Sequence, residues 1–240
     1  MAIELAVFDM AGTTVDDQGA VNRCFRATLA GHGLAVRADA VDAVMGLPKP
    51  EALRILVGRS ALADALLGRV DAMHAEFVAR MVEFYAHDPS VREAPGASVL
   101  FAMLKEAGVK VGLDTGFCRE IADVILERLA WTSPDLVDAT VASDEVANGR
   151  PMPDMIENLM GRLGVSNPRS VVKVGDAPAD LEEGFAARCR WVVGVTWGTH
   201  SRAQLEKCAH THLVDTMAEL TELFRSGITG KGGSLEASVS

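Results

Sequence analysis

Short apolar runs alternate with helical patterns along much of the chain. Five of these runs, rich in β-branched residues, predict strands buried on both faces, at residues 5–8, 109–113, 139–141, 171–174 and 191–195. Helical periodicity predicts a helix over residues 120–129 and another over residues 153–163, which ends before Gly164. Strands that alternate with helices predict a parallel sheet with right-handed crossovers.

The first two predicted strands are separated by about a hundred residues, although a parallel crossover usually needs one helix of about a dozen residues. Residues 21–85 are helical in pattern throughout, which predicts a helical lobe inserted after the first strand. Pro89 and Pro95-Gly96 indicate the return to the sheet. We therefore expect an α/β core of residues 1–18 and 90–225, a helical lobe of residues 19–89, and a loose Gly- and Ser-rich tail of residues 226–240.

Composition narrows the classes of protein. The 23 Lys and Arg residues against 33 Asp and Glu residues leave a net charge of −10, which disfavours nucleic acid and anionic membranes as partners. No apolar stretch reaches the ~18 residues of a spanning helix, and the N-terminus lacks the basic start of a signal peptide. The four cysteines are scattered, which favours reduced thiols. We expect a soluble cytoplasmic protein.

Carboxylates follow four of the predicted strands, as Asp9, Asp114, Asp144 and Asp176. Open parallel sheets bind ligands at the carboxyl ends of their strands, so these side chains are expected at one edge. A single aspartate there is commonly only a helix cap, and Asp114 is expected to do no more than that. Several carboxylates together favour a bound cation, and oxygen ligands favour Mg²⁺.

Further residues beside these carboxylates suit phosphoryl chemistry. Gly12 permits a tight turn, and the Thr13 hydroxyl and backbone N–H groups could hold a phosphoryl oxygen. Arg150 precedes a predicted helix, where it could neutralise Asp9 and a phosphoryl group, and Thr115 adds a hydroxyl donor. We therefore predict an aspartyl-phosphate intermediate, whose formation would use a carboxylate nucleophile, a cation, a threonine and an arginine.

A second acid accompanies the predicted metal ligands. Asp180 follows Asp176 by four residues, which is consistent with one metal ligand and one supporting acid on the same turn. Asp144 is expected beside the same ligands. The motifs FDMAGTTVD, Thr115, GRPMPD and VGDAPAD resemble, in this order, those of the haloacid dehalogenase superfamily, from about Ile3 to Leu223. The resemblance implies a Rossmann-like core with an α-helical cap, Asp9 as nucleophile, and Mg²⁺ held by Asp9, the Ala11 carbonyl and Asp176.

Residue 11 narrows the reaction. Phosphatases of this superfamily usually carry a second aspartate there, which protonates the departing alcohol. Ala11 cannot do this, so the chain is either a slow phosphatase or an enzyme whose leaving group is carbon. A C–P bond breaks heterolytically only when an electron sink stabilises the carbanion, and a lysine imine with a neighbouring aldehyde is such a sink.

Lys49 is the candidate for that imine. The sequences FDMAGTTVD and MGLPK resemble those of phosphonoacetaldehyde hydrolases (phosphonatases). The resemblance implies that Lys49 forms the imine, that Met45 packs beside it, and that Gly116 and Phe117 contact substrate. Apolar surroundings would lower the pKa of the Lys49 amine as the chemistry requires. The alternatives are a solvated surface lysine and a methionine that only fills the core.

The chain departs from the phosphonatase pattern at four positions, where Met10, Gly19, Ala52 and Phe117 replace tryptophan, cysteine, histidine and tyrosine. The substrate is therefore phosphonoacetaldehyde or a different small phosphonate or phosphate. One alternative is a small-metabolite phosphomonoesterase resembling phosphoglycolate phosphatase, in which Lys49 selects an anion. Another is a non-catalytic phosphate-binding protein. The resemblance also implies a homodimer formed through the cap.

Overall fold

A six-stranded parallel sheet forms the centre of the molecule in the computed structural model, which describes residues 2–16 and 18–228. The strands lie in the order β5-β4-β1-β6-β7-β8, so that β1 lies inside the sheet, between β4 and β6. Their bounds are β1 Leu5–Asp9, β4 Lys110–Thr115, β5 Ala139–Ala142, β6 Val171–Gly175, β7 Trp191–Val195 and β8 His212–Val214. The five predicted strands are confirmed, and the fold is α/β as expected.

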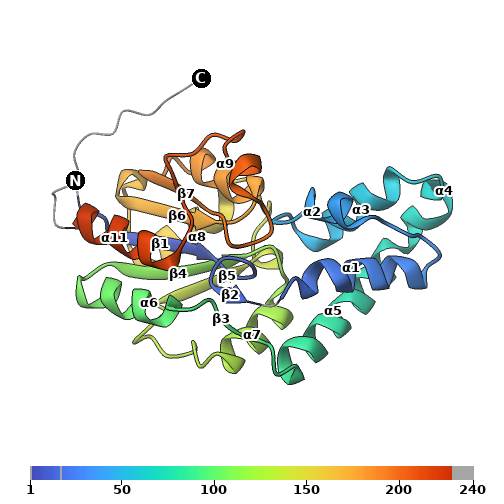
Figure 1. The fold of residues 1–240 in the computed structure, drawn as a ribbon, viewed down its shortest axis with the longest axis horizontal. Coiled ribbons are helices and arrows are strands. Elements are labelled where there is room, and N and C mark those ends of the chain that lie inside the picture. The colour runs from blue at the N-terminus through green and yellow to red at the C-terminus, as the bar shows by residue number, and fades with distance from the viewer. Residues whose placement is uncertain (1, 17, 229–240) are drawn as a thin grey trace.

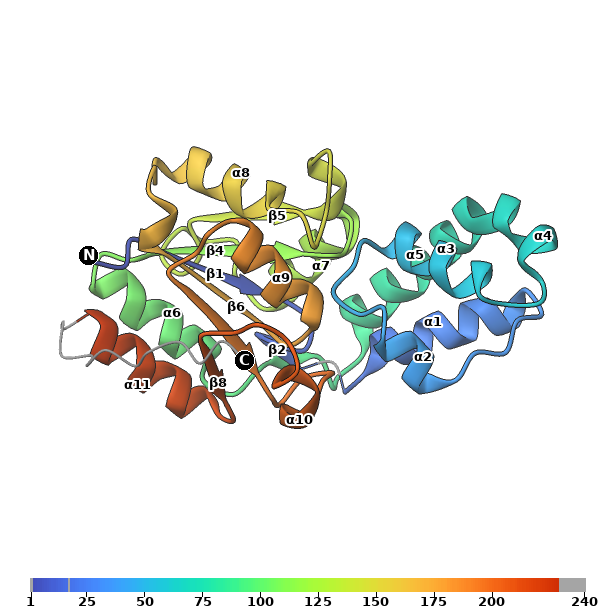
Figure 2. The same ribbon diagram turned by 90° about the horizontal axis from the view of Figure 1, so that it is seen from above.

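Helices cover both faces of the sheet (Figures 1 and 2). One face carries α6 (Ala97–Glu106), α7 (Arg119–Arg128) and α11 (Met217–Ile228), and the other carries α8 (Asp154–Leu163) and α9 (Pro178–Ala186). Side chains of β1 alternate between the two layers, as the pleat of a strand requires. Phe8 packs against Phe101 and Phe224, whereas Leu5 and Val7 pack into the layer of α8 and α9. The predicted helices at 120–129 and 153–163 are thereby confirmed.

Five helices form a separate lobe beyond the carboxyl ends of the strands (Figure 2). They are α1 (Ala20–Gly31), α2 (Ala38–Asp42), α3 (Lys49–Gly58), α4 (Ala63–Leu66) and α5 (Val70–His87). This confirms the helical insertion predicted after the first strand, while the division at residues 18, 89 and 225 stays a prediction. The remaining helical elements are short: the helix α10 (Arg202–Leu205) and the 3-10 turns η1 (Leu67–Arg69), η2 (Ser143–Glu145) and η3 (Pro168–Ser170).

A two-stranded antiparallel ribbon lies where the chain passes between sheet and lobe. It consists of β2 (Val15–Asp16) and β3 (Arg92–Glu93), and the Asp16 carboxylate pairs with the Arg92 guanidinium at 2.8 Å. Strands of two residues are too short to produce a readable alternation, so the sequence did not predict them. The ribbon ties together the two chain segments that leave and re-enter the sheet.

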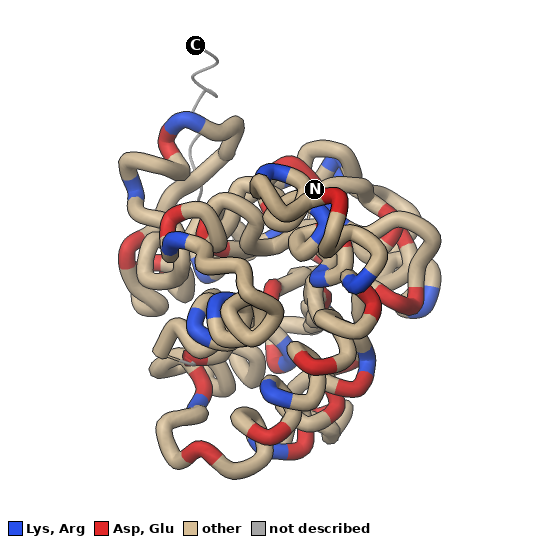
Figure 3. Tube along the Cα trace, turned by 90° about the vertical axis from the view of Figure 1, so that its right-hand side faces the viewer, with Lys and Arg blue, Asp and Glu red and all other residues tan. Residues whose placement is uncertain are grey.

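Charge is distributed unevenly between lobe and core. Residues 19–89 contain eight Lys and Arg residues and eight Asp and Glu residues, so the lobe is neutral and the acidic excess belongs to the rest of the chain. Figure 3, which faces the lobe, shows basic and acidic positions interspersed over it. The predicted tail of residues 226–240 is wrong at its start, because residues 226–228 complete α11; the remainder lies outside the described residues. No described helix is long and apolar enough to cross a membrane.

Candidate active site

A cavity of about 770 Å³ lies between the lobe and the carboxyl ends of the strands. Both parts of the chain line it, and the structure here brings together most of the residues predicted from the sequence: Asp9, Ala11, Gly12, Met45, Lys49, Thr115, Gly116, Phe117, Arg150 and Asp176. The size is typical of a small-molecule site. These residues, which are distant in the sequence, therefore lie together around one cavity.

The loop after β1 brings Asp9 and Asp176 together. Gly12 has a φ of +91°, and a Cβ atom there would lie 2.5 Å from Oδ2 of Asp176, so only glycine fits. The Thr14 hydroxyl donates to the Asp9 carbonyl at 2.8 Å. The Thr13 hydroxyl donates to Oδ1 of Asp176 at 3.3 Å, and Thr13 is absent from the cavity lining. In this structure the hydroxyl is bound to the carboxylate, and its contact with a phosphoryl oxygen stays a prediction.

Arg150 is the centre of a buried ionic network. Its side chain is only 1% exposed, and one terminal nitrogen lies 2.6 Å from Oδ1 of Asp9 and 2.9 Å from Oδ1 of Asp180. The other terminal nitrogen pairs with Asp114, and Nε donates to Glu183 at 2.9 Å. Carboxylates on four sides hold the guanidinium in a single orientation toward Asp9.

Lys173, on β6, is a second buried cation behind Asp9. Its Nζ lies 2.6 Å from Oδ2 of Asp114, 2.9 Å from Glu183 and 3.3 Å from Asp180. Sequence reasoning missed both Lys173 and Glu183, and it was wrong to treat Asp114 as only a helix cap. A lysine within the apolar strand VVKVG was the available signal, because a buried ammonium must be paired with an acid.

Asp9, Asp176 and Asp180 form a buried acidic cluster whose ligand oxygens lie within 4.8 Å of one another. Burial raises the pKa of Asp9 to about 7, helped by Asp180 and Asp176 and opposed by Arg150. Burial and Asp180 also raise the pKa of Asp176. Crowded carboxylates of this kind fit a divalent cation, since its charge would relieve their mutual repulsion. The oxygen-only donor set suits Mg²⁺.

The loop after β7 completes the surroundings of Asp176. The backbone N–H of Thr199 donates to Oδ2 of Asp176 at 2.6 Å, and Nδ1 of His200 lies 3.1 Å from the Asp176 carbonyl. Trp197 donates from its indole N–H to the Thr13 carbonyl at 3.0 Å. These contacts fix the Asp176 carboxylate relative to the β1 loop.

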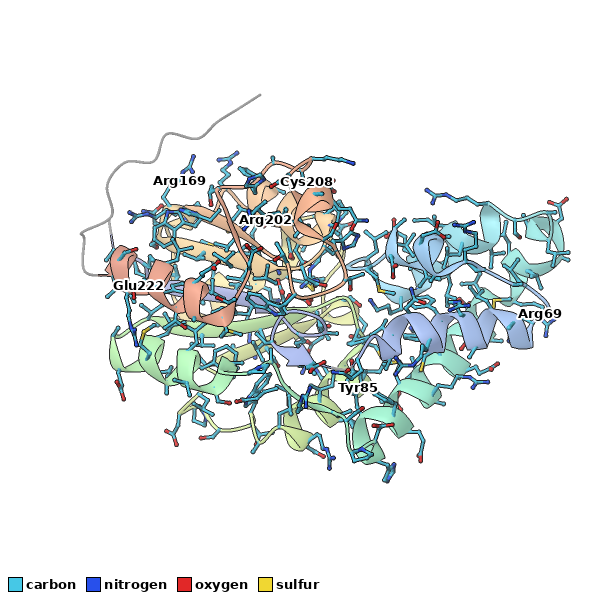
Figure 4. The ribbon with its side chains drawn as sticks, in the orientation of Figure 1. Arg69, Tyr85, Arg169, Arg202, Cys208 and Glu222 are labelled. Atoms are coloured by element: carbon cyan, nitrogen blue, oxygen red, sulfur yellow. The ribbon has the colours of Figure 1, made fainter. Side chains whose placement is uncertain are left out.

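Lys49 is the first residue of α3 and points into the cavity from the lobe. It is 5% exposed, its Nζ lies 4.9 Å from the centre of the Phe117 ring, and it donates to the Leu47 carbonyl at 3.3 Å. Burial lowers the pKa of Lys49 to about 8, with Arg150 adding to the effect and Asp9 opposing it. The solvated surface lysine is therefore excluded. Tyr85 packs edge-on against Phe117 with ring centres 5.9 Å apart, at the base of the lobe (Figure 4).

Asp144 is not part of this site, and its predicted place beside the metal ligands is wrong. The residue is exposed, and its carboxylate accepts a hydrogen bond from the Arg119 backbone N–H at 2.8 Å. Asp144 therefore caps the start of α7, which is the common role of an aspartate after a strand.

The parallel sheet has an acidic pocket at its carboxyl edge, and a helical lobe lies above that pocket. These features define the class of Rossmann-like α/β proteins with a helical cap over the site. The model of the haloacid dehalogenase-like hydrolase family matches residues 6–194. The chain belongs to this family.

Three similar proteins have informative names. A phosphonoacetaldehyde hydrolase of Bacteroides fragilis is 32% identical over 216 residues, which cover 87% of this chain and 81% of the relative. The crystal structure of a phosphonoacetaldehyde hydrolase like protein from Oleispira antarctica has a TM-score of 0.83 at 23% identity and covers 95% of this chain and 94% of that one. A putative phosphoglycolate phosphatase of Lactobacillus delbrueckii subsp. bulgaricus has a TM-score of 0.76 at 22% identity, with coverages of 93% and 99%. The two structures support the fold.

Proposed function

We propose that this protein is a Mg²⁺-dependent hydrolase that cleaves the C–P bond of phosphonoacetaldehyde or a close analogue. The observation that carries this proposal is the position of Lys49, whose amine is buried in the same cavity as Asp9 and has its pKa lowered to about 8. Ala11 lines the cavity where phosphatases of the superfamily place an acid. The name of the Bacteroides fragilis relative supports the same activity.

The acidic cluster would hold the metal ion. The proposed ligands are Asp9, the Ala11 carbonyl and Asp176. Asp180 belongs to the same acidic cluster and is proposed as the supporting acid. A bound Mg²⁺ would stabilise negative charge on the phosphoryl oxygens. Arg150 orients Asp9, and the Thr115 hydroxyl and the Gly116 backbone N–H, which line the cavity, would bind phosphoryl oxygens. The Gly12 N–H donates to the Val15 carbonyl at 2.9 Å, so Gly12 contributes the tight turn.

The reaction proceeds in two covalent stages. The neutral amine of Lys49 adds to the substrate aldehyde and expels water, which forms an imine. The imine nitrogen takes up a proton to become an iminium. Asp9 then attacks phosphorus, the C–P bond breaks, and its electron pair moves into the iminium to give a neutral enamine. Water hydrolyses the aspartyl phosphate to phosphate, and protonation followed by hydrolysis of the enamine releases acetaldehyde and the free Lys49 amine. Phe117 borders this amine and Met45 lines the same cavity, so both side chains would limit the access of water to it.

The test is to incubate the protein with phosphonoacetaldehyde and Mg²⁺ and to measure acetaldehyde and phosphate together. Equal amounts of both products are expected. Borohydride added during turnover should attach substrate covalently to Lys49, because an imine is reducible and a salt bridge is not. The matched control Lys49→Arg keeps the charge but forms no imine, so it should release no acetaldehyde; normal cleavage by this variant would refute the mechanism.

A second candidate is a phosphomonoesterase, which one observation favours. With a pKa of about 8, most Lys49 side chains are protonated at pH 7, and an ammonium group binds a substrate anion. Rapid hydrolysis of phosphoglycolate, retained in Lys49→Arg, would support this function. Phosphate binding without turnover of any substrate would instead support a non-catalytic role. A homodimer formed through the helical lobe stays a prediction, which light scattering tests.

A further inference from the structure

The cavity reaches a lobe wall that the proposed reaction does not use. Besides Lys49 and Met45, the lobe lines it with Asn22 from α1 and Asp42 from α2. Phosphonoacetaldehyde has only two carbons, and its phosphonate and aldehyde are already bound by the core and by Lys49 in the proposed reaction. The polar wall formed by Asn22 and Asp42 therefore has no partner in that reaction.

Asp42 differs from the other carboxylates that line the cavity. Those of the core are each held by a positive or hydrogen-bonding group: Asp9 by Arg150, Asp16 by Arg92, Asp215 by Arg202, and Asp176 by Thr13 and Thr199. Within the described part of the chain, the Asp42 carboxylate accepts a hydrogen bond from the Asn22 amide alone, at 2.6 Å, and no residue forms an ion pair with it. This carboxylate is half-buried, and no cation among the described residues pairs with it.

Asn22 adds a second acceptor to the same wall. Its Nδ2 donates to the Ala38 carbonyl at 2.9 Å as well as to Asp42, which uses both of its hydrogens. This fixes the amide so that its oxygen remains an acceptor, and within the described chain no donor reaches that oxygen. The wall thus presents a carboxylate and an amide oxygen, and both are complementary to a cationic donor.

We propose that Asp42 and Asn22 select an ammonium group on the substrate. This inference rests on the proposed function. It assigns the substrate class, which is a phosphonate with a carbonyl β to phosphorus and an amine on the same carbon chain. The phosphonate binds at Asp9, the carbonyl reacts with Lys49, and the ammonium group pairs with Asp42. The unused wall and the unpaired carboxylate are both explained by this class of substrate.

The test uses stable probes, so that it is independent of turnover. Titration calorimetry on the Mg²⁺-loaded protein would compare 2-aminoethylphosphonate with ethylphosphonate, and 3-aminopropylphosphonate with propylphosphonate. A hydrogen-bonded charge contact predicts about tenfold tighter binding of an ammonium compound than of its neutral partner. Equal affinities within both pairs, or no binding of either ammonium compound, would overturn the assignment.

Variants on α2 identify the residue responsible. Asp42→Asn is isosteric and retains an acceptor for Asn22, and it should reduce the preference for the ammonium compound to about twofold or less. Asp39→Asn is the matched control, because Asp39 is exposed on the same helix and pairs with Arg37 outside the cavity. A preference that survives in Asp42→Asn refutes the proposal. Failure to cleave the C–P bond of phosphonoacetaldehyde and of its amino-substituted analogues would refute the proposed function, whereas the binding comparison tests the ammonium contact separately.

Discussion

Asp9 lies at the end of β1 among groups that shift its pKa in opposite directions. Burial and the neighbouring acids Asp176 and Asp180 raise the pKa of Asp9 to about 7, while the Arg150 guanidinium favours its ionised form. A nucleophilic carboxylate must be ionised and correctly oriented, and Arg150 contributes to both at 2.6 Å. At the scale of single residues, the proposed mechanism depends on how Asp9, Lys49 and Ala11 are placed relative to each other.

Asp9→Asn should abolish turnover and leave the fold intact. The amide has the shape of the carboxylate but is neither a nucleophile toward phosphorus nor an anionic metal ligand. Phosphate release would be measured for the variant and for the wild type treated with a chelator, and both should lose activity. Circular dichroism is the control for folding. Substantial turnover by Asp9→Asn would contradict the aspartyl-phosphate mechanism.

The pH dependence of cleavage should follow Lys49. Because burial lowers the pKa of this amine to about 8, the neutral form needed for imine formation increases as the pH rises through that value. Acetaldehyde release at low substrate concentration should therefore rise about tenfold per pH unit below pH 8 and level off above it. Hydrolysis of p-nitrophenyl phosphate needs no imine and serves as the control. A flat profile for phosphonoacetaldehyde between pH 6 and 8 would exclude this role.

Ala11→Asp should shift the preference between leaving groups. General acid catalysis is worth ~10²–10⁴-fold, so an aspartate here should raise alkyl-phosphate hydrolysis, though by less than that because its surroundings are not adapted to it. C–P cleavage should fall, because a carboxylate at this position could pair with the Lys49 iminium and displace it. Both substrates would be assayed with both proteins at saturating Mg²⁺. Rapid hydrolysis of alkyl phosphates by the wild type would show that another group supplies the proton.

At the scale of elements, the turn that leads into α3 carries Lys49 against the core. A Cβ atom on Gly116 would lie 2.7 Å from the carbonyl oxygens of both Gly46 and Leu47, and one on Gly149 would lie 2.4 Å from Pro48. Backbone of the lobe thus touches backbone of the core beside β4. This close approach sets how far Lys49 lies from Asp9, since the two residues belong to different parts of the fold.

Gly116→Ala should therefore impair catalysis more than stability. The added methyl group pushes the Gly46–Leu47 turn away from the core, and a displacement of about 1 Å can reduce kcat/KM about 100-fold. The measurement is acetaldehyde release together with thermal unfolding. Gly161→Ala is the matched control, because Gly161 lies in α8 with nothing within 4 Å of the added carbon; it should leave kcat/KM unchanged and add up to ~1 kcal/mol of stability. Unchanged kcat/KM in Gly116→Ala would contradict this role of the contact.

At the scale of the whole molecule, one buried ionic network joins β1, β4, β6, α9 and the loop that contains Arg150. Lys173 and Arg150 share Asp114, Asp180 and Glu183, and all five side chains are excluded from solvent. Burial alone would lower the pKa of Lys173, but Asp114 and Glu183 hold it above its usual value. Each charge in such a network depends on the others, because an unpaired buried ion is costly.

Lys173→Met should destabilise the fold far more than loss of a surface pair. It leaves Asp114 and Glu183 short of one cation, and breaking a buried pair on one side costs about 3–5 kcal/mol. Arg37→Met is the control, since Arg37 and Asp39 form a fully exposed pair whose loss should change the free energy of unfolding little. Urea unfolding at pH 7 would measure both free energies of unfolding. Similar losses in the two variants would show that the network contributes little to stability.

The amino-acid sequence by itself determined five of the six strands of the parallel sheet, the helical insertion and most of the candidate site residues. Five apolar runs matched strands to within a few residues, because strands buried on both faces must be apolar along their whole length. Asp9 and Asp176 could be selected because carboxylates follow buried strands, and Arg150 because it precedes a helix beside them. Lys49 could be selected only through Ala11 and the resemblance of MGLPK to the phosphonatase sequence. The strand pair β2–β3 could not be predicted, because a strand of two residues is too short to show an alternation of apolar and polar positions.

Only the tertiary structure decided which carboxylates belong to the site. Asp114 and Asp144 both follow apolar strands and are equivalent in the sequence. The sheet order separates them: β4 is the neighbour of β1 and sets Asp114 opposite Asp9 in register, whereas Asp144 follows the edge strand β5 and caps α7. The pairing of Lys173 with Asp114, and of Asp42 with Asn22, likewise depends on contacts between residues distant in the chain, because charge acts through space and not along the sequence.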